Sequence, residues 1–228
     1  MEELKHERPA EAEQFNTGHQ EYARFIETDP IRNYLHYPEV IRALGEGTKG
    51  KLLDIGCGDG LFDRKLAEGY GTQIVGYDIS PNLVEKATRL EAEKPQGIEY
   101  RTADPLTFQS DEQFDNAVSV MVMPYAPSEA YLSNFFASAY KHLPNGGKFI
   151  SVIFNPDFND FNEVVANRFF RKGDGNKIKF DFLDPENNAV KFSAELAQFS
   201  RETYESSARA GGFTKIEWRT LTPNDEGV

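Results

Sequence analysis

Short apolar runs alternate with amphipathic segments through the middle of the chain, and this alternation predicts a parallel sheet. Five runs have the length and residue types of strands: 51–55, 73–77, 98–102, 114–122 and 148–154. Apolar residues recur at helical spacing in the segments 61–68, 81–93 and 128–142. Strands joined by helical crossovers lie parallel, so the fold class is α/β with a doubly wound, mostly parallel sheet.

The two ends of the chain carry different patterns. Apolar and aromatic residues recur at helical spacing over 21–26 and 31–44, which predicts N-terminal helices. After the fifth strand the pattern predicts, in order, a helix at 157–170, an antiparallel hairpin of 177–184 with 189–199, a helix at 201–210 and a last strand at 213–221.

These segments fit into a single domain that spans residues 1–228. Within it we expect an N-terminal helical lid or extension at 1–46 and a cofactor-binding core at 47–154. The remainder, 155–228, is expected to form an insertion on the substrate side and the edge of the sheet.

The most informative motif follows the first predicted strand, where residues 52–60 read Leu-Leu-Asp-Ile-Gly-Cys-Gly-Asp-Gly. Gly56, Gly58 and Gly60 occupy alternate positions. Glycine adopts positive φ angles and lets a ligand approach the backbone closely. The helix that follows directs its free N–H groups at the same place. The pattern is typical of a loop that binds a nucleotide cofactor.

Further candidate residues stand at the ends of the next strands. Asp78 follows the second strand, where a carboxylate can accept two hydrogen bonds from a ribose diol. Asp104 follows the third strand and could accept from the amine of a base. Val120 and Met121 lie at the exit of the fourth strand. Because the carboxyl ends of parallel strands share one edge of a sheet, we expect these groups to meet there.

Charge and composition narrow the possible partners. The formal net charge is −12, so the chain lacks the basic surface that nucleic acid requires. No apolar run reaches the roughly 18 residues of a membrane span. The N-terminal residues are polar and charged, unlike a secretory signal, so we expect a soluble, cytoplasmic protein. The single cysteine and the spacing of the four histidines indicate no metal site.

The glycine loop and Asp78 alone also fit an NAD(P)-dependent oxidoreductase. The third glycine is placed differently from that of a dinucleotide loop, Asp104 has no role there, and no residue set for hydride transfer is evident. A non-catalytic module that binds the cofactor stays open as a second alternative.

Over residues 51–153 the chain resembles the class I S-adenosylmethionine-dependent methyltransferases. The resemblance rests on the glycine loop, Asp78, Asp104, the exit of the fourth strand and the Pro-Asn-Gly-Gly turn before the fifth. It implies a Rossmann-like fold with S-adenosylmethionine as cofactor. The implied cofactor-binding residues are Asp54, Gly56, Cys57, Gly58, Asp78, Ile79, Asp104, Pro105, Val120 and Met121.

The resemblance also implies a role for each of these positions. The loop glycines lie under the methionine part of the cofactor, and Asp54 orients the loop near the ammonium. Asp78 holds the ribose hydroxyls, while Asp104 contacts the adenine amine and Ile79 packs on the adenine ring. The backbone at Val120 and Met121 meets the amino-acid end.

A narrower resemblance rests on the N-terminal aromatic helices, on Met-Pro-Tyr-Ala at 123–126 and on Asn-Pro at 155–156. It is to small-molecule methyltransferases related to the toxoflavin N-methyltransferase, which implies a nitrogen heterocycle as methyl acceptor. Candidates for a base or for orienting the acceptor are His19, Tyr22, Tyr125 and Asp157. The chain departs from the family at its end, where one predicted strand replaces the usual hairpin of strands 6 and 7. The hairpin at 177–199, or a reduced sheet edge, could account for this departure.

Overall fold

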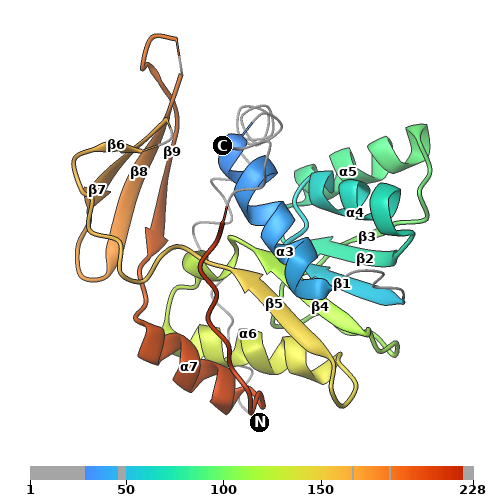
Figure 1. Cartoon of the computed structure of the whole chain (residues 1–228). Helices are drawn as coiled ribbons and strands as arrows, with labels where there is room; N and C mark the ends of the chain where they lie inside the picture. The colour runs from blue at the N-terminus through green and yellow to red at the C-terminus, as the bar shows by residue number, and fades with distance from the viewer. Residues whose placement is uncertain (1–28, 46–49, 166, 185, 223–228) are drawn as a thin grey trace.

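A five-stranded parallel sheet forms the centre of the molecule (Figure 1). The computed structural model describes residues 29–45, 50–165, 167–184 and 186–222. The strand order is β3-β2-β1-β4-β5, and all neighbouring pairs are parallel. The strands are β1 Lys51–Ile55, β2 Gln73–Asp78, β3 Glu99–Thr102, β4 Asn116–Val120 and β5 Lys148–Val152. The predicted doubly wound fold is confirmed.

Helices cover both faces of this sheet. Figure 1 shows α3, α4 and α5 on one face and α6 and α7 on the other. Their bounds are α3 Tyr37–Leu44, α4 Leu61–Tyr70, α5 Pro81–Glu93, α6 Glu129–Lys141 and α7 Arg201–Ala210. Two buried clusters result: Leu52 and Ile74 of the sheet belong to one, and Leu53 and Tyr77 belong to the other. Adjacent strand residues point to opposite faces, so the apolar strands fill both cores.

Local sequence sets the ends of several helices. The side chains of Ser80, Ser128 and Ser200 accept hydrogen bonds from backbone N–H groups three residues later. Each serine therefore caps a helix N-terminus, as its position before an apolar-periodic segment predicts. Helix α4 runs past Gly69, where we expected it to stop, and ends at Gly71 with a φ of 62°. This left-handed conformation at the end of a helix favours glycine.

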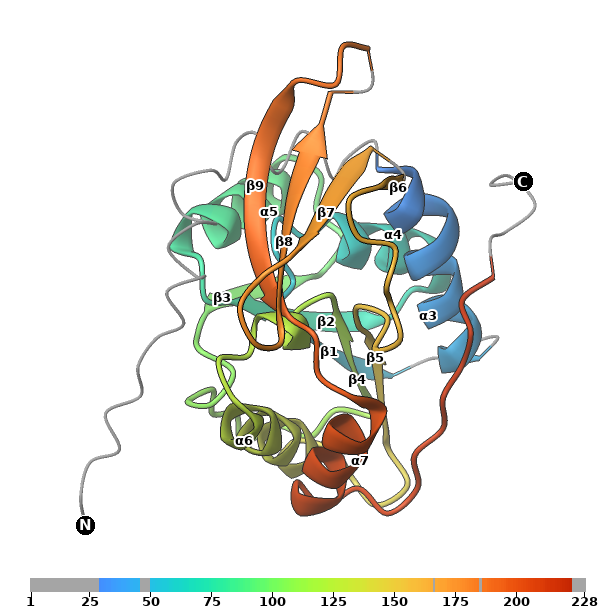
Figure 2. The ribbon, with the colours of Figure 1, turned by 90° about the vertical axis from the view of Figure 1, so that its left-hand side faces the viewer.

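The segment after β5 forms a second, antiparallel sheet with strand order β6-β7-β8-β9. Its strands are β6 Val164–Val165, β7 Arg168–Lys172, β8 Lys177–Leu183 and β9 Val190–Ala197. Figure 2 views the molecule from the side on which this sheet stands, in front of the parallel sheet. The expected antiparallel element is confirmed as a separate sheet, so the hairpin does not supply a sixth strand to the parallel one.

The helix predicted at 157–170 is wrong. This segment consists of turns followed by β6 and the start of β7. Asn162 and Asn167 adopt φ values of 64° and 60°, which a helix does not allow. The aromatic spacing that suggested a helix has another use. Phe158 packs on Phe161 and Phe170, with ring centroids 5.5 and 4.8 Å apart, beneath the antiparallel sheet.

The strand predicted at 213–221 is also wrong, because this segment joins neither sheet. Phe213, Ile216 and Trp218 pack against the buried cluster under α6 and α7. Farther along, Thr222 Oγ1 accepts a hydrogen bond of 2.9 Å from Arg42 of α3. The alternating apolar residues therefore cover helices instead of pairing with β5, and the described parallel sheet ends at β5.

The chain is helical from residue 30 to residue 44, with a π-helical turn, η1, at Arg32–His36 before α3. The predicted helix at 21–26 lies outside the described residues. Asp29 and Arg168 form a buried ion pair of 2.7 Å that ties the start of this helical segment to β7. Among the helices that the structure describes, none has the length and apolar character needed to cross a membrane.

Candidate functional site

The glycine loop after β1 turns sharply across the end of β2. Gly56, Gly58 and Gly60 have φ values of 83°, 58° and 75°, in the region that side chains rarely adopt. The N–H groups of Gly56 and Cys57 donate to the carbonyl of Tyr77 over 2.8 and 3.0 Å. These two hydrogen bonds fix the loop to β2 at Tyr77, the residue before Asp78.

Space beside the loop differs from one glycine to the next. A Cβ on Gly56 would lie 2.2 Å from Val122 Cγ2, so only glycine lets the loop approach the β4 exit. A Cβ on Gly58 would meet no heavy atom within 4 Å. Gly58 therefore presents bare backbone to an open space, as a cradle for a ligand requires.

Asp78 organises this cradle. Its Oδ2 accepts a hydrogen bond of 2.9 Å from the N–H of Gly58, and its Oδ1 accepts one of 2.8 Å from the N–H of Ser80. Burial raises the pKa of this carboxyl, and the two backbone donors oppose the rise. Each carboxylate oxygen has two lone pairs, so Asp78 can still accept from two further hydroxyl groups.

Asp104 lies one strand farther out. The N–H of Ala103 donates to the carbonyl of Asp78 over 3.0 Å, which places the ends of β2 and β3 side by side. Asp104 Oδ1 accepts a hydrogen bond of 2.7 Å from the N–H of Leu106, so the side chain also stabilises the turn that follows β3. Ile79 and Asp104 are half-buried and Pro105 is buried.

The exit of β4 forms the other side of the loop. Met121 adopts a φ of 59°, an uncommon conformation for a residue with a side chain, and its N–H donates to the carbonyl of Val152 over 2.8 Å. The close approach of Val122 to Gly56 brings this exit against the glycine loop. The strand order reverses between β1 and β4, and ligands of open α/β sheets bind at such switch points.

The loop also covers a group of buried acidic side chains. Asp54 on β1 is 3% exposed, and burial raises its pKa to about 7. Asp63, in the first turn of α4, is 0% exposed, and burial together with Asp54 raises its pKa well above the usual range. Burial raises the pKa of the Cys57 thiol too, so this cysteine stays neutral and is not an activated nucleophile.

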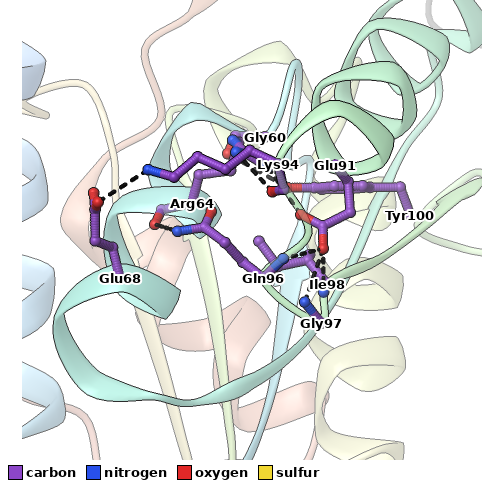
Figure 3. A network of polar contacts seen from close by, with 9 residues as sticks. All are labelled: Gly60, Arg64, Glu68, Glu91, Lys94, Gln96, Gly97, Ile98 and Tyr100. Carbon is purple, nitrogen blue, oxygen red and sulfur yellow. Dashed lines mark hydrogen bonds and ion pairs between the residues drawn. The ribbon is translucent and has the colours of Figure 1, made fainter.

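A polar network supports the loop from behind, between α4, α5 and β3 (Figure 3). Glu91 Oε1 accepts from the N–H groups of Gln96, Gly97 and Ile98 over 2.5, 2.8 and 3.2 Å. Its Oε2 pairs with Arg64 of α4 over 2.8 Å. The Tyr100 hydroxyl donates to the carbonyl of Gly60 over 3.4 Å, so the network reaches the glycine loop itself.

Replacing Glu91 by alanine is expected to lower the free energy of unfolding by roughly 3 kcal/mol, because three backbone donors and one guanidinium lose a charged acceptor. Urea denaturation measures this change. Glu93→Ala, on an exposed position of the same helix, should stay within about 0.5 kcal/mol of wild type. Equal stability of the two variants would contradict the supporting role of Glu91.

The antiparallel sheet packs over the carboxyl edge of the parallel sheet. Its inner face is rich in aromatic side chains, and Leu61 of α4 and Tyr125 of η2 (Met123–Tyr125) pack against it. The aromatic members are Tyr125, Phe154, Phe158, Phe161, Phe170, Phe180, Phe182 and Phe192. Because Leu61 directly follows the glycine loop, this apolar cover lies next to the loop.

The candidate bases are placed very differently. His19 and Tyr22 lie outside the described residues. Tyr125 is half-buried beneath the antiparallel sheet. Asp157 is exposed, and its Oδ2 accepts from Arg201 Nε and a terminal guanidinium nitrogen over 3.0 and 2.8 Å. This pairing favours a structural role for Asp157 at the start of α7.

A cavity of about 320 Å³ lies elsewhere, at the amino ends of the strands, where Lys51, Gln73 and Glu99 contribute to its lining. Ligands of this fold class bind at the carboxyl ends, so the cavity is not the candidate site. The site built from the loop, Asp78 and the β4 exit stands at the opposite edge of the sheet.

Comparison with known proteins shows what the parallel core is similar to. Residues 52–147 match the family described as "Methyltransferase domain". The segment from β1 to the turn before β5 is therefore similar to a methyltransferase domain. This similarity favours S-adenosylmethionine as the cofactor over the NAD(P) of the oxidoreductase interpretation.

Several named relatives methylate small molecules. The chain is 29% identical over 174 residues to phosphoethanolamine N-methyltransferase 2 of Caenorhabditis elegans, which covers 70% of the chain and 39% of the relative. It is 29% identical over 92 residues to N-demethylindolmycin N-methyltransferase of Streptomyces griseus, covering 38% of the chain and 39% of the relative. The chain thus spans well under half of the length of both curated relatives.

Solved structures share the fold of this chain. The sugar N-methyltransferase KedS8 of Streptoalloteichus sp. has a TM-score of 0.63 at 22% identity, over 85% of this chain and 83% of that one. CalS10, an amino pentose methyltransferase of Micromonospora echinaspora with S-adenosylmethionine bound, has a TM-score of 0.63 at 19% identity. That match covers 85% of this chain and 87% of CalS10.

The sequence did not reveal two features of this candidate site. Asp63 reads as an ordinary acidic residue in the first turn of a helix, where the helix dipole favours it. The sequence did offer one sign that Asp63 is buried. It stands between Phe62 and Leu66, which lie on the buried side of α4. The extent of the aromatic cover beneath the antiparallel sheet was hidden because Phe158 and Phe161 also fit helical spacing.

Proposed function

We propose that this chain transfers the methyl group of S-adenosylmethionine to a nitrogen atom of a small molecule, and that the acceptor is a flat nitrogen heterocycle. The observation that supports this most is the convergence of the open backbone at Gly58, the carboxylate of Asp78 and the β4 exit at one switch point. The family supports the cofactor, and the names of the relatives support a small acceptor.

The residues of the site fit the cofactor. Asp78 has lone pairs left for the ribose hydroxyls. The hydrogen bond within the turn uses Oδ1 of Asp104, so its Oδ2 can receive the adenine amine. Ile79 and Pro105 offer apolar surface to the base, while Asp54 and Cys57 lie under the loop that would carry the methionine part. The backbone of Val120 and Met121 would meet the amino-acid end.

Bound S-adenosylmethionine supplies an activated methyl group on a positively charged sulfur. The chain itself supplies orientation and exclusion of water. Fixing donor and acceptor in line can contribute on the order of 7–11 kcal/mol to lowering the barrier. A nitrogen nucleophile can lose its proton late in the reaction, so the reaction does not require a strong base. Among the described candidates, Tyr125 is the best placed to orient an acceptor.

The aromatic cover supports a flat acceptor. Tyr125, Phe154 and Phe158 of this cover are half-buried, so part of their ring surface stays exposed. A planar heterocycle could stack on such a ring, gaining about 0.5–1.5 kcal/mol beyond the burial of its area.

Methyl-labelled cofactor tests the proposal. The protein is incubated with a metabolite extract and S-adenosylmethionine that carries a deuterated methyl group, and products are identified by mass spectrometry. The expected result is a labelled small molecule with the label on nitrogen. Cofactor binding without any labelled product would instead favour the non-catalytic module, and a label on oxygen or carbon would overturn the choice of acceptor atom.

A further inference from the structure

The carboxyl group of Asp63 is buried beneath the glycine loop without a described donor. Its side chain is 0% exposed, and no N–H or O–H group among the described residues donates to Oδ1 or Oδ2. Asp54 Oδ1 is in the same situation. Buried carboxylate oxygens without partners are strongly unfavourable, so something must neutralise them.

The packing brings Asp63 and Asp54 to the same place. Asp54 of β1 lies opposite Gly76 of β2 in the register of the sheet. A Cβ on Gly76 would lie 2.8 Å from Asp63 Oδ2 and 2.9 Å from the Cβ of Cys57. Because Gly76 has no side chain, the carboxyl group of Asp63 on α4 fits against β2 at this position. Asp63 there lies beside the side chain of Asp54.

Among the residues that the structure describes, no cation is paired with Asp54 or Asp63. The titratable groups that interact with the pair from the loop and from β2 and β3 are Cys57, Asp59, Tyr77, Asp78 and Tyr100, none of which is a cation. The cation Arg64 is paired with Glu91, and Lys86 is paired with Asp59 over 2.7 Å. In the described part of the chain no set of His, Cys, Asp and Glu could hold a metal ion. A proton is the remaining neutralising partner.

We propose that Asp63 is a positioning residue that stays protonated and donates its hydrogen bond to Asp54, so that Asp54 faces the methionine end of the cofactor as a single, oriented negative charge. This inference rests on the proposed cofactor site. Burial and the neighbouring carboxyl favour the proton on Asp63, whose pKa lies well above that of an ordinary aspartate.

Two variants separate hydrogen-bond donation from charge and from volume. Asp63→Asn keeps an N–H donor without a charge, and Asp63→Leu keeps a similar volume without any donor. Calorimetric titration with S-adenosylmethionine at pH 8, above the pKa of about 7 of Asp54, should give wild-type affinity within about threefold for Asp63→Asn and at least tenfold weaker binding for Asp63→Leu. Circular dichroism establishes that both variants are folded.

Other outcomes overturn the inference. Equal wild-type affinity of both variants means that Asp63 does not position the site, and equal loss in both means that its negative charge is needed. If wild type itself does not bind the cofactor, the proposed function fails, whereas the protonation of the pair is still tested by a measurement on the cofactor-free protein.

That measurement is the pH dependence of unfolding. In the unfolded chain both carboxyls lose their protons near pH 4, whereas in the folded chain the pKa of Asp54 is raised to about 7 and that of Asp63 is raised well above its usual range. The folded state therefore binds more protons over this range, and the unfolding equilibrium constant rises with pH, tenfold per pH unit for each proton. Between pH 5 and 7, the unfolding equilibrium constant of Asp63→Asn should rise less steeply with pH than that of wild type. The difference in slope should correspond to up to one proton. Parallel slopes would show that Asp63 is ionised in the folded protein.

Discussion

Replacing Asp78 by alanine is expected to weaken binding of S-adenosylmethionine by roughly 100-fold or more. The variant would lose both acceptors for the ribose hydroxyls, and each hydrogen bond to a charged group contributes about 1.5–3 kcal/mol. It would also free the N–H of Gly58, which Asp78 holds over 2.9 Å, so the loop loses its fixed position. Equilibrium dialysis with labelled cofactor measures the affinity.

Asp115→Ala provides the control for Asp78→Ala. Asp115 also accepts a backbone N–H, from Lys51 over 2.8 Å, but it does so at the amino end of β1, away from the loop. This variant should lose stability to a similar degree and keep the affinity of wild type. Asp78→Ala with unchanged affinity would show that the cofactor does not use this carboxylate.

The second large effect is expected at Gly56. Alanine there must adopt a φ near 83° and would place its Cβ 2.2 Å from Val122. Left-handed backbone costs about 1–2 kcal/mol, and overpacking a tight contact costs about 1–3 kcal/mol. The free energy of unfolding should therefore fall by roughly 3 kcal/mol, as measured by urea denaturation.

Gly58→Ala separates stability from binding. Its φ of 58° carries the same backbone cost of about 1–2 kcal/mol, but its Cβ would meet nothing within 4 Å. We expect a stable protein whose cofactor affinity falls at least about tenfold, because the methyl group occupies space intended for the ligand. A Gly58→Ala variant less stable than Gly56→Ala would contradict this description of the loop.

The sequence predicted the parallel core because its signals are local. Apolar periodicity defines the strands, and serines at positions 80, 128 and 200 cap the helices that follow them. The topology of parallel α/β sheets then places the ends of β1, β2 and β4 at one edge. For this reason the amino-acid sequence alone predicts that the loop glycines, Asp78 and the β4 exit are neighbours.

The remaining errors come from contacts between distant segments. Phe158 and Phe161 have helical spacing, yet they pack beneath strands that lie farther along the chain. The segment 213–221 has alternating apolar residues, yet they cover α6 and α7 instead of pairing with β5. Asp63 joins Asp54 only because Gly76 leaves room between them. Such contacts are decided by packing, which periodicity does not encode.

The edge built from Gly58, Asp78 and the β4 exit is expected to bind S-adenosylmethionine. Isothermal titration calorimetry of the full chain tests this expectation, with NADH as the competing ligand in a parallel titration. We expect saturable binding of S-adenosylmethionine with one site per chain and no heat of binding with NADH. Binding of NADH, or no binding of S-adenosylmethionine by the folded wild-type protein, would refute the assignment of this edge as the cofactor site.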